Sequence, residues 1–208
     1  MENKGEKQQK NMSPSAENLR YYGKNAESYC SSTVGADMSF CLEKFLGYLP
    51  KQGQVLDAGC GSGRDSLYMQ KRGYQVEAFD ASRKICAWAE KYTGIPVMQL
   101  SFEQMEIQEK YHGIWACASL LHVAEEDMDD VFLRLHHALR RQGILYASFK
   151  RGTGRRIKEG RYFTDHTETS LKKLAENTGF SVVECFLTGD VRSEYEGQIW
   201  VNLIARKE

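Results

Sequence analysis

The sequence lacks every signal that would direct the chain to a membrane. No apolar stretch near the N-terminus resembles a signal peptide, and no run elsewhere approaches the roughly 20 apolar residues of a membrane-spanning helix. An excess of charge is missing too, because 28 basic residues balance 28 acidic ones, so no overall field attracts the protein to nucleic acid or to an anionic membrane. We therefore expect a cytoplasmic protein that does not bind membranes.

Paired cysteine motifs are also absent. The six cysteines are Cys30, Cys41, Cys60, Cys86, Cys117 and Cys185. None belongs to a C-x-x-C pair, which argues against a zinc site and against a compact disulfide framework. His136 and His137 are consecutive and point in different directions on a helix, so they do not form a metal site either. We predict reduced thiols that pack as small apolar groups, and no bound metal.

What the sequence does contain is an alternation of apolar strands and amphipathic helices. Strands are predicted over 55–57, 75–80, 97–101, 114–119 and 144–149, with helices over 64–72, 84–92 and 127–141. Strands separated by helices form parallel βαβ units with right-handed crossovers. After a helix over 167–177, two strands, 180–188 and 198–205, have a connection short enough for an antiparallel pair. The pattern predicts an α/β fold: a doubly wound, mostly parallel seven-stranded sheet with helices on both faces and a C-terminal antiparallel hairpin.

The chain ahead of the first strand divides into two parts. Residues 1–15 have almost no apolar side chains, which predicts a disordered tail. Apolar and aromatic residues begin after Glu17, and Asp37 can cap a helix that runs to Leu46. We interpret 16–208 as a single domain, in which 16–50 form an N-terminal helical lid and 51–208 a Rossmann-like core.

Three glycines follow the first strand in the stretch VLDAGCGSGRD. Ligands of open α/β sheets bind beyond the carboxyl ends of the strands, where Gly59, Gly61 and Gly63 would let a ligand rest against the backbone. The spacing departs from the G-x-G-x-x-G of dinucleotide sites, with Arg64 in place of the last glycine, and no Gly-Lys-Ser/Thr follows as in a P-loop. Asp80 ends the second strand, where a carboxylate can accept hydrogen bonds from two ribose hydroxyls. These residues indicate an adenosine-like ribose without a pyrophosphate.

The motif D-x-G-x-G-x-G, the acid of the second strand, the stretch IWACASLLHV and the closing hairpin occur in one order along the chain. In this the chain resembles the class I S-adenosylmethionine-dependent methyltransferases and, within them, small members near the tellurite-resistance group. The resemblance implies S-adenosyl-L-methionine as the cofactor, methyl transfer as the reaction and 16–208 as one methyltransferase domain. It also implies the cofactor-binding residues: Tyr22 and Tyr29 in the lid, Asp57, Gly59 and Gly61 at the methionine part, Asp80 at the ribose, Ala81, Ser101 and Phe102 at the adenine, and Cys117 and Ala118 beneath the cofactor.

His122 follows the fourth strand, where members of this family often place groups that face the substrate. A histidine there could accept a proton from the incoming nucleophile, so we take it as the candidate catalytic residue. The alternative is a surface loop histidine. Tyr22 and Tyr29 likewise either cover the cofactor or pack within an amphipathic helix.

The acceptor of the methyl group is open. The segment after the fifth strand concentrates positive charge at Arg151, Arg155, Arg156, Lys158 and Arg161. These residues could hold a phosphate or carboxylate of the substrate, bind RNA, or form a solvated loop. We predict a small-molecule acceptor, while RNA and the oligomeric state stay open. Two alternative functions share the fold: an NAD-dependent oxidoreductase and a non-catalytic S-adenosylmethionine-binding domain.

Overall fold

The protein was analysed as a computed structural model that describes residues 13–208. Its helices are α1 (Pro14–Thr33), α2 (Ser39–Leu46), α3 (Arg64–Lys71), α4 (Arg83–Thr93), α5 (Met128–Ala138) and α6 (Glu168–Asn177). Its strands are β1 (Gln54–Ala58), β2 (Gln75–Asp80), β3 (Val97–Gln99), β4 (Tyr111–Ala116), β5 (Leu139–Lys150), β6 (Gly154–Lys158), β7 (Arg161–Asp165), β8 (Phe180–Gly189) and β9 (Ile199–Lys207). The predicted tail falls on 1–12, outside the described residues, and on 13–15, where α1 begins at Pro14.

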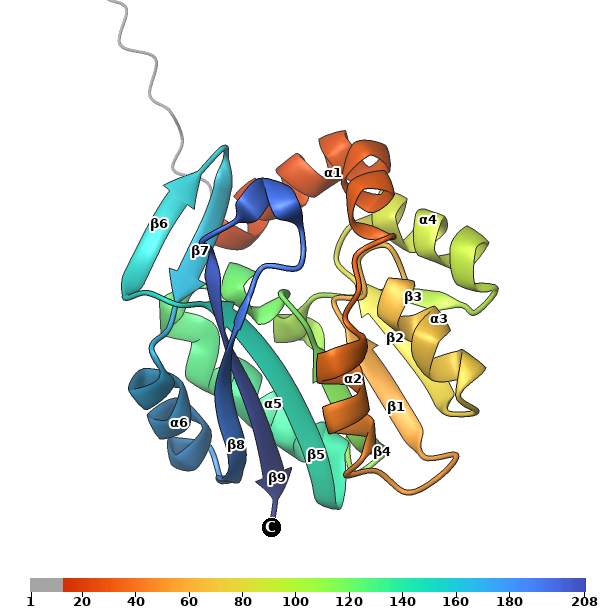
Figure 1. Cartoon of the computed structure of the whole chain (residues 1–208), viewed down its shortest axis with the longest axis vertical. Coiled ribbons are helices and arrows are strands. Elements are labelled where there is room, and N and C mark those ends of the chain that lie inside the picture. The colour runs from red at the N-terminus through yellow and green to blue at the C-terminus, as the bar shows by residue number, and fades with distance from the viewer. Residues whose placement is uncertain (1–12) are drawn as a thin grey trace, which may run out of the picture.

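One seven-stranded sheet forms the centre of the molecule, in the order β3-β2-β1-β4-β5-β9-β8 (Figure 1). Strands β1 to β5 run parallel, whereas β9 is antiparallel to both β5 and β8. The strand order reverses between β1 and β4, which is the switch point where open α/β sheets bind ligands. The predicted doubly wound sheet with a closing antiparallel pair is confirmed.

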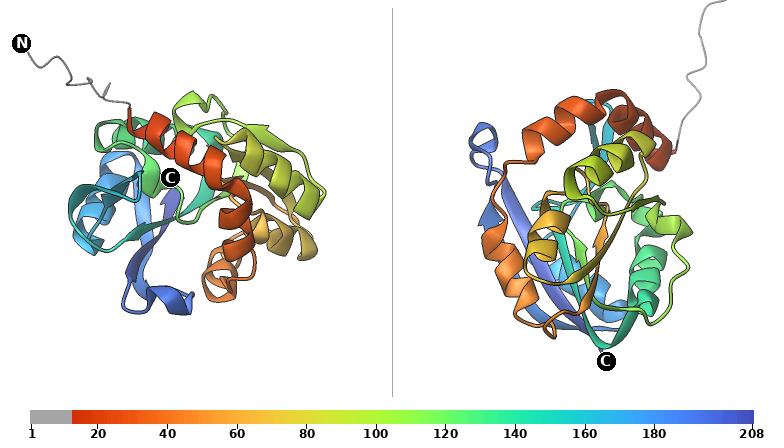
Figure 2. Two further views of the ribbon diagram at one scale, coloured as in Figure 1. Left: turned by 90° about the horizontal axis from the view of Figure 1, so that it is seen from above. Right: turned by 90° about the vertical axis from the view of Figure 1, so that its right-hand side faces the viewer.

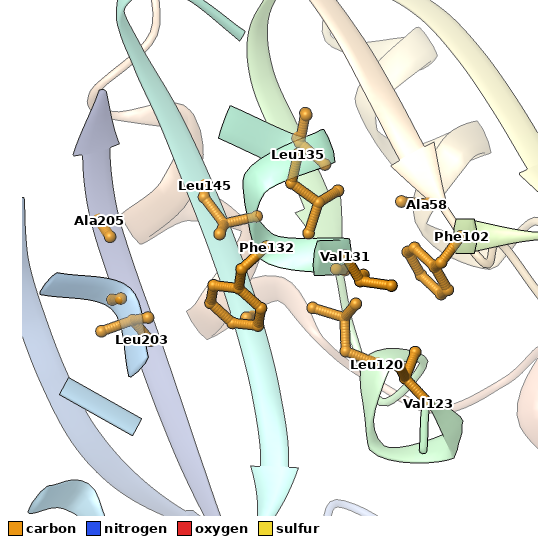
Figure 3. Close-up of a cluster of buried hydrophobic side chains, with 14 of the residues drawn as sticks. Ala58, Phe102, Leu120, Val123, Val131, Phe132, Leu135, Leu145, Leu203 and Ala205 are labelled. Carbon is orange, nitrogen blue, oxygen red and sulfur yellow. The ribbon is translucent and has the colours of Figure 1, made fainter. Parts of the chain in front are cut away.

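Alternating side chains of the strands build a separate core on each face of the sheet. In β5, Leu145 joins a core with α5 and α6, while its neighbour Tyr146 joins a core with α2 and α3. The first core appears in Figure 3, where Phe132 and Leu135 of α5 lie against Leu145 of the sheet. Successive residues of a strand point to opposite faces, so strands that are buried throughout require helices on both sides. Figure 2 shows these two helical layers.

Two predicted segments differ from the structure. The helix expected over 127–141 ends at Ala138, because Leu139 already pairs with Tyr111 of β4 and begins β5. The basic segment after β5 is a hairpin, β6–β7, rather than a loop. Its turn residues, Glu159 and Gly160, have φ of 55° and 72°, the two positive values that tight hairpin turns need.

Helix α1 crosses the carboxyl end of the parallel strands and lies above the sheet (Figure 1). Near its start, Asn18 is buried and donates to the carbonyls of His122 and Tyr162 while accepting from the Tyr162 N–H. At its end, the Thr33 carbonyl accepts from Arg64. Between these two attachments, the backbone leaves helical geometry at Asn25 (φ −110°, ψ 16°). The predicted lid segment therefore includes a kinked helix anchored at both ends.

Candidate functional site

The three glycines of the turn after β1 meet three different neighbours. A Cβ at Gly59 would lie 2.6 Å from the Cβ of Ser119, so this position requires glycine for close packing. A Cβ at Gly63 would meet Thr93 of α4 at 2.6 Å. Gly59 and Gly61 both line the site, and the nearest neighbour of Gly61 is the Tyr29 side chain, whose hydroxyl would lie 3.4 Å from an added Cβ. Gly59 and Gly63 thus serve packing, and Gly61 exposes backbone beneath Tyr29.

Asp80 connects the glycine turn to the start of α4. Its Oδ2 accepts from the Gly61 N–H at 3.2 Å and its Oδ1 from the Ser82 N–H at 2.9 Å. Burial raises the pKa of Asp80 to about 6, and these two hydrogen bonds oppose that rise. Each carboxylate oxygen has capacity for a further hydrogen bond. Asp80 can therefore receive two ribose hydroxyls, although it also holds the turn.

A first pocket opens beside Asp80, between α1 and the ends of β2 and β3. Its floor and far wall are mainly apolar, from Phe79, Ile85, Leu100, Phe102 and Val123. Ser82, which is 2% exposed, lines this pocket, and its hydroxyl oxygen has no hydrogen-bond partner among residues 13–208. Ala81 and Ser101 complete the rim near Asp80. A carboxylate, an unpaired hydroxyl and apolar walls suit the ribose and base of an adenosine group.

A second, more polar pocket adjoins the first, under the β6–β7 hairpin and the connection between β8 and β9. Asp57 of β1 and Cys117, which follows β4, line this pocket together with Lys150 of β5, Arg161 of β7 and Trp200 of β9. The two pockets share a neck formed by Tyr22, Tyr29, Gly59, Gly61, Ala118 and His122. Every residue predicted for the site therefore lines one or both pockets; their roles stay predictions.

The neck contains a strained residue. Ala118 has a φ of 52°, in the left-handed region that alanine rarely adopts, and its N–H donates to Ser148 Oγ at 2.8 Å. Such conformations persist only where the surroundings enforce them, and they concentrate at functional sites.

Tyr22 and His122 face one another across the neck. The Tyr22 hydroxyl lies 2.6 Å from His122 Nε2, and His122 Nδ1 lies 2.9 Å from the Tyr162 carbonyl. Since a carbonyl can only accept, Nδ1 carries the proton and Nε2 accepts from Tyr22. Burial lowers the pKa of His122 to about 4 and raises that of Tyr22 to about 12. His122 is thus neutral at pH 7 and partly buried, unlike a surface loop histidine.

Asp57 and Asp65 form an acidic pair beneath the glycine turn. Asp65 is held by two hydrogen bonds from Arg64, at 2.7 and 2.8 Å, and by one from Trp115. Asp57 accepts from Ser66 Oγ at 2.6 Å, and burial together with the charge of Asp65 raises its pKa to about 7. Both acids line the second pocket, and Asp57 is the one that makes no ion pair within the described part of the chain.

The basic residues after β5 divide into two groups. Arg151 pairs with Glu168 and Arg156 with Asp165, while Arg155 and Lys158 are exposed on β6. Only Arg161 of this segment enters the second pocket. Lys150 and Trp200, which also line the pocket, carried no motif that sequence reasoning could detect, because only the pairing of β5 with β9 brings them together.

Within residues 13–208, no group of His, Cys, Asp or Glu side chains could hold a metal ion, and no helix is long and apolar enough to cross a membrane.

Comparison with known proteins gives a family match over part of the chain. Residues 55–143 match the family described as a methyltransferase domain. The curated "Putative methyltransferase YqeM" of Bacillus subtilis (strain 168) is 26% identical over 113 residues, which span 49% of this chain and 46% of that protein. The chain therefore covers less than half the length of this relative.

Solved structures share the fold over almost the whole chain. The 1,6-didemethyltoxoflavin-N1-methyltransferase of Burkholderia thailandensis, solved with 1,6-didemethyltoxoflavin and S-adenosylhomocysteine, is 21% identical with a TM-score of 0.73, covering 91% of this chain and 84% of that one. The magnesium protoporphyrin IX methyltransferase of Synechocystis PCC 6803, solved with S-adenosylmethionine, is 18% identical with a TM-score of 0.69, covering 96% and 100%.

The family match supports the predicted resemblance to the class I S-adenosylmethionine-dependent methyltransferases. The matched family is a methyltransferase domain, and the two solved structures hold S-adenosylhomocysteine or S-adenosylmethionine, in agreement with the predicted class of enzyme and cofactor; neither alternative function is favoured. The narrower placement near the tellurite-resistance group stays a prediction.

Proposed function

We propose that this chain transfers the methyl group of S-adenosyl-L-methionine to a small molecule bound in the second pocket. The observation that carries the proposal is the neck, through which a mainly apolar pocket and a polar pocket meet at Tyr22, Gly61 and His122. When bound, S-adenosyl-L-methionine supplies an electrophilic methyl group. The protein has to align the acceptor with that group and exclude water, and such alignment can contribute roughly 7–11 kcal/mol.

Asp80 and Ser82 would hold the ribose and base, and Asp57 would face the methionine part. These assignments fit the unpaired hydroxyl of Ser82 and the position of Asp57 at the second pocket. Gly61 would let the bound molecule lie against the backbone. Tyr29 fills the space above Gly61 in this structure, so it has to shift when that space is occupied.

Tyr22 and His122 would carry the proton of the acceptor. The Tyr22 oxygen can accept a proton from the acceptor side while its own proton passes to His122 Nε2. An acceptor becomes far more acidic as it forms its new bond to carbon, so the weak basicity of His122 is sufficient. A thiolate acceptor would not need this path.

Helix α1 closes the site above the neck, which favours a small acceptor over RNA, since a polymer needs an open groove. A cytoplasmic location remains part of the proposal, drawn from composition. The test is a calorimetric titration with S-adenosylhomocysteine, followed by transfer of labelled methyl groups to a panel of thiols, amines, phenols and carboxylic acids. Binding without transfer to any acceptor class would indicate a non-catalytic domain, and heat from NAD alone would reject the proposal.

A further inference from the structure

The second pocket contains more positive charge than its acids neutralise. Arg192 donates to Asp190 through Nε and Nη2, each at 3.0 Å, and Arg64 is paired with Asp65. Among the described residues, the remaining cations of the pocket are Lys150 and Arg161. Lys150 and Arg161 therefore have hydrogen-bond donors at the pocket wall that no carboxylate of the pocket uses.

Lys150 has no carboxylate within ion-pair distance in the described part of the chain, and its ammonium makes no hydrogen bond there. It lies instead between two aromatic rings, 4.9 Å from the centre of Phe163 and 5.8 Å from that of Trp200. Burial and the nearby charges of Arg156 and Arg161 lower the pKa of Lys150. An ammonium in such surroundings is stabilised by any anion that enters the pocket.

Arg161 reaches the same ring from β7, the strand that also contains Phe163. Its guanidinium lies 5.3 Å from the centre of Phe163, and its Nε is buried without a hydrogen-bond partner among the described residues. Its one carboxylate partner, Glu159, is 60% exposed at the hairpin turn and is bound through Nη2. Lys150 and Arg161 therefore share one aromatic neighbour and both have unused donors at the pocket wall.

We propose that the methyl acceptor is a small planar acid, whose carboxylate or phosphate group is held by Lys150 and Arg161 while its ring lies against Trp200. A planar molecule that carries an anionic group fits this site, because the two cations can bind the anion while the aromatic side chain packs against the planar ring. A neutral acceptor would leave both donors unpaired in a partly buried site, which is costly. This substrate class rests on the proposed function, but the anion site can be tested separately.

The experiment uses pyridoxal 5′-phosphate as a planar anionic probe and pyridoxal as its uncharged counterpart. The Lys150 amine condenses with the aldehyde and releases water, and borohydride then reduces the imine to a stable secondary amine that peptide mass spectrometry locates. We expect the phosphate probe to label Lys150 about tenfold faster than the exposed Lys158, and pyridoxal to lose this preference. Arg161→Gln should remove the preference in the same way.

The matched control variants are Arg155→Gln and Lys158→Met, which delete the same charges from the exposed face of β6. They should leave Lys150 labelling unchanged, and thermal melts identify any variant that does not fold. Uniform labelling of the surface lysines, or equal labelling of Lys150 by both probes, would overturn the anion site. Calorimetry with S-adenosylhomocysteine on wild type and Lys150→Met tests the cofactor site independently, so its failure would reject the proposed function without altering the labelling result.

Discussion

The affinity for S-adenosylhomocysteine should weaken as the pH falls below 6, because Asp80 has to be ionised to receive ribose hydroxyls. In the free protein, burial raises the pKa of Asp80 from 3.8 to about 6. Hydroxyl donors stabilise the carboxylate and lower its pKa in the complex. By linkage, the affinity is fully present above the free-protein pKa and is lost as the pH falls through that value.

The structure gives the size of this effect. At pH 5, one unit below a pKa of about 6, roughly a tenth of the Asp80 side chains are ionised, so the dissociation constant should be about tenfold larger than at pH 7.5. Asp57, whose pKa is about 7, also titrates within this range, so wild type alone does not isolate Asp80. The assay is therefore calorimetry between pH 5 and 8 on wild type and Asp80→Asn, with thermal melts in the same buffers.

Asp80→Asn should bind more weakly and lose the part of the pH dependence that belongs to Asp80. The asparagine also cannot accept from both Gly61 and Ser82 as the carboxylate does, so the deciding quantity is the difference in slope with pH rather than the absolute affinity. Parallel pH profiles for the two proteins would refute the reasoning and would leave Asp80 as a residue that only holds the turn.

Three further predictions address the turn, the proton path and the lid. Gly59→Ala should reduce the free energy of unfolding by roughly 1–3 kcal/mol, because the added Cβ would lie 2.6 Å from Ser119. Gly61→Val should instead weaken cofactor binding more than it reduces stability. Thermal melts and titrations would contradict this if both variants lost stability and binding together. His122→Asn should reduce kcat by roughly a hundredfold with little change in cofactor KM, and an unchanged kcat would exclude it from proton transfer. Hydrogen exchange of residues 19–32 should slow when S-adenosylhomocysteine is added while that of 182–205 changes little; equal protection with and without ligand would mean that the tyrosines are ordinary packing.

The residues proposed for the cofactor could be found from the sequence because they follow local signals. Strand β2 was predicted with its observed bounds. Once the strand is found, Asp80 is placed at its end and Ala81 directly after it. The separate roles of the glycines could not be predicted from the sequence. Gly59 packs against Ser119 and Gly63 against α4, and both neighbours are distant in sequence.

The acceptor half was not predictable from local pattern. Lys150 and Trp200 are 50 positions apart in the numbering and become neighbours because β9 returns antiparallel to β5. Arg161 was noticed only as one member of a basic segment, because the hairpin that separates it from the exposed Arg155 and Lys158 has a Glu-Gly turn rather than a strong turn signal.

Arg64, the residue that departs from the dinucleotide pattern, links the glycine turn to the lid. It donates to both carboxylate oxygens of Asp65, one of which also accepts from Trp115 in the core. It also donates to the carbonyl of Thr33 at the end of α1. The start of α1 is fixed separately, by Asn18. With both ends held, a movement of the lid has to be taken up between them, and the non-helical residue Asn25 is where α1 already bends. Tyrosines on either side of this bend cover the neck, so a change in the bend would open or close it while the ends of the helix stay in place.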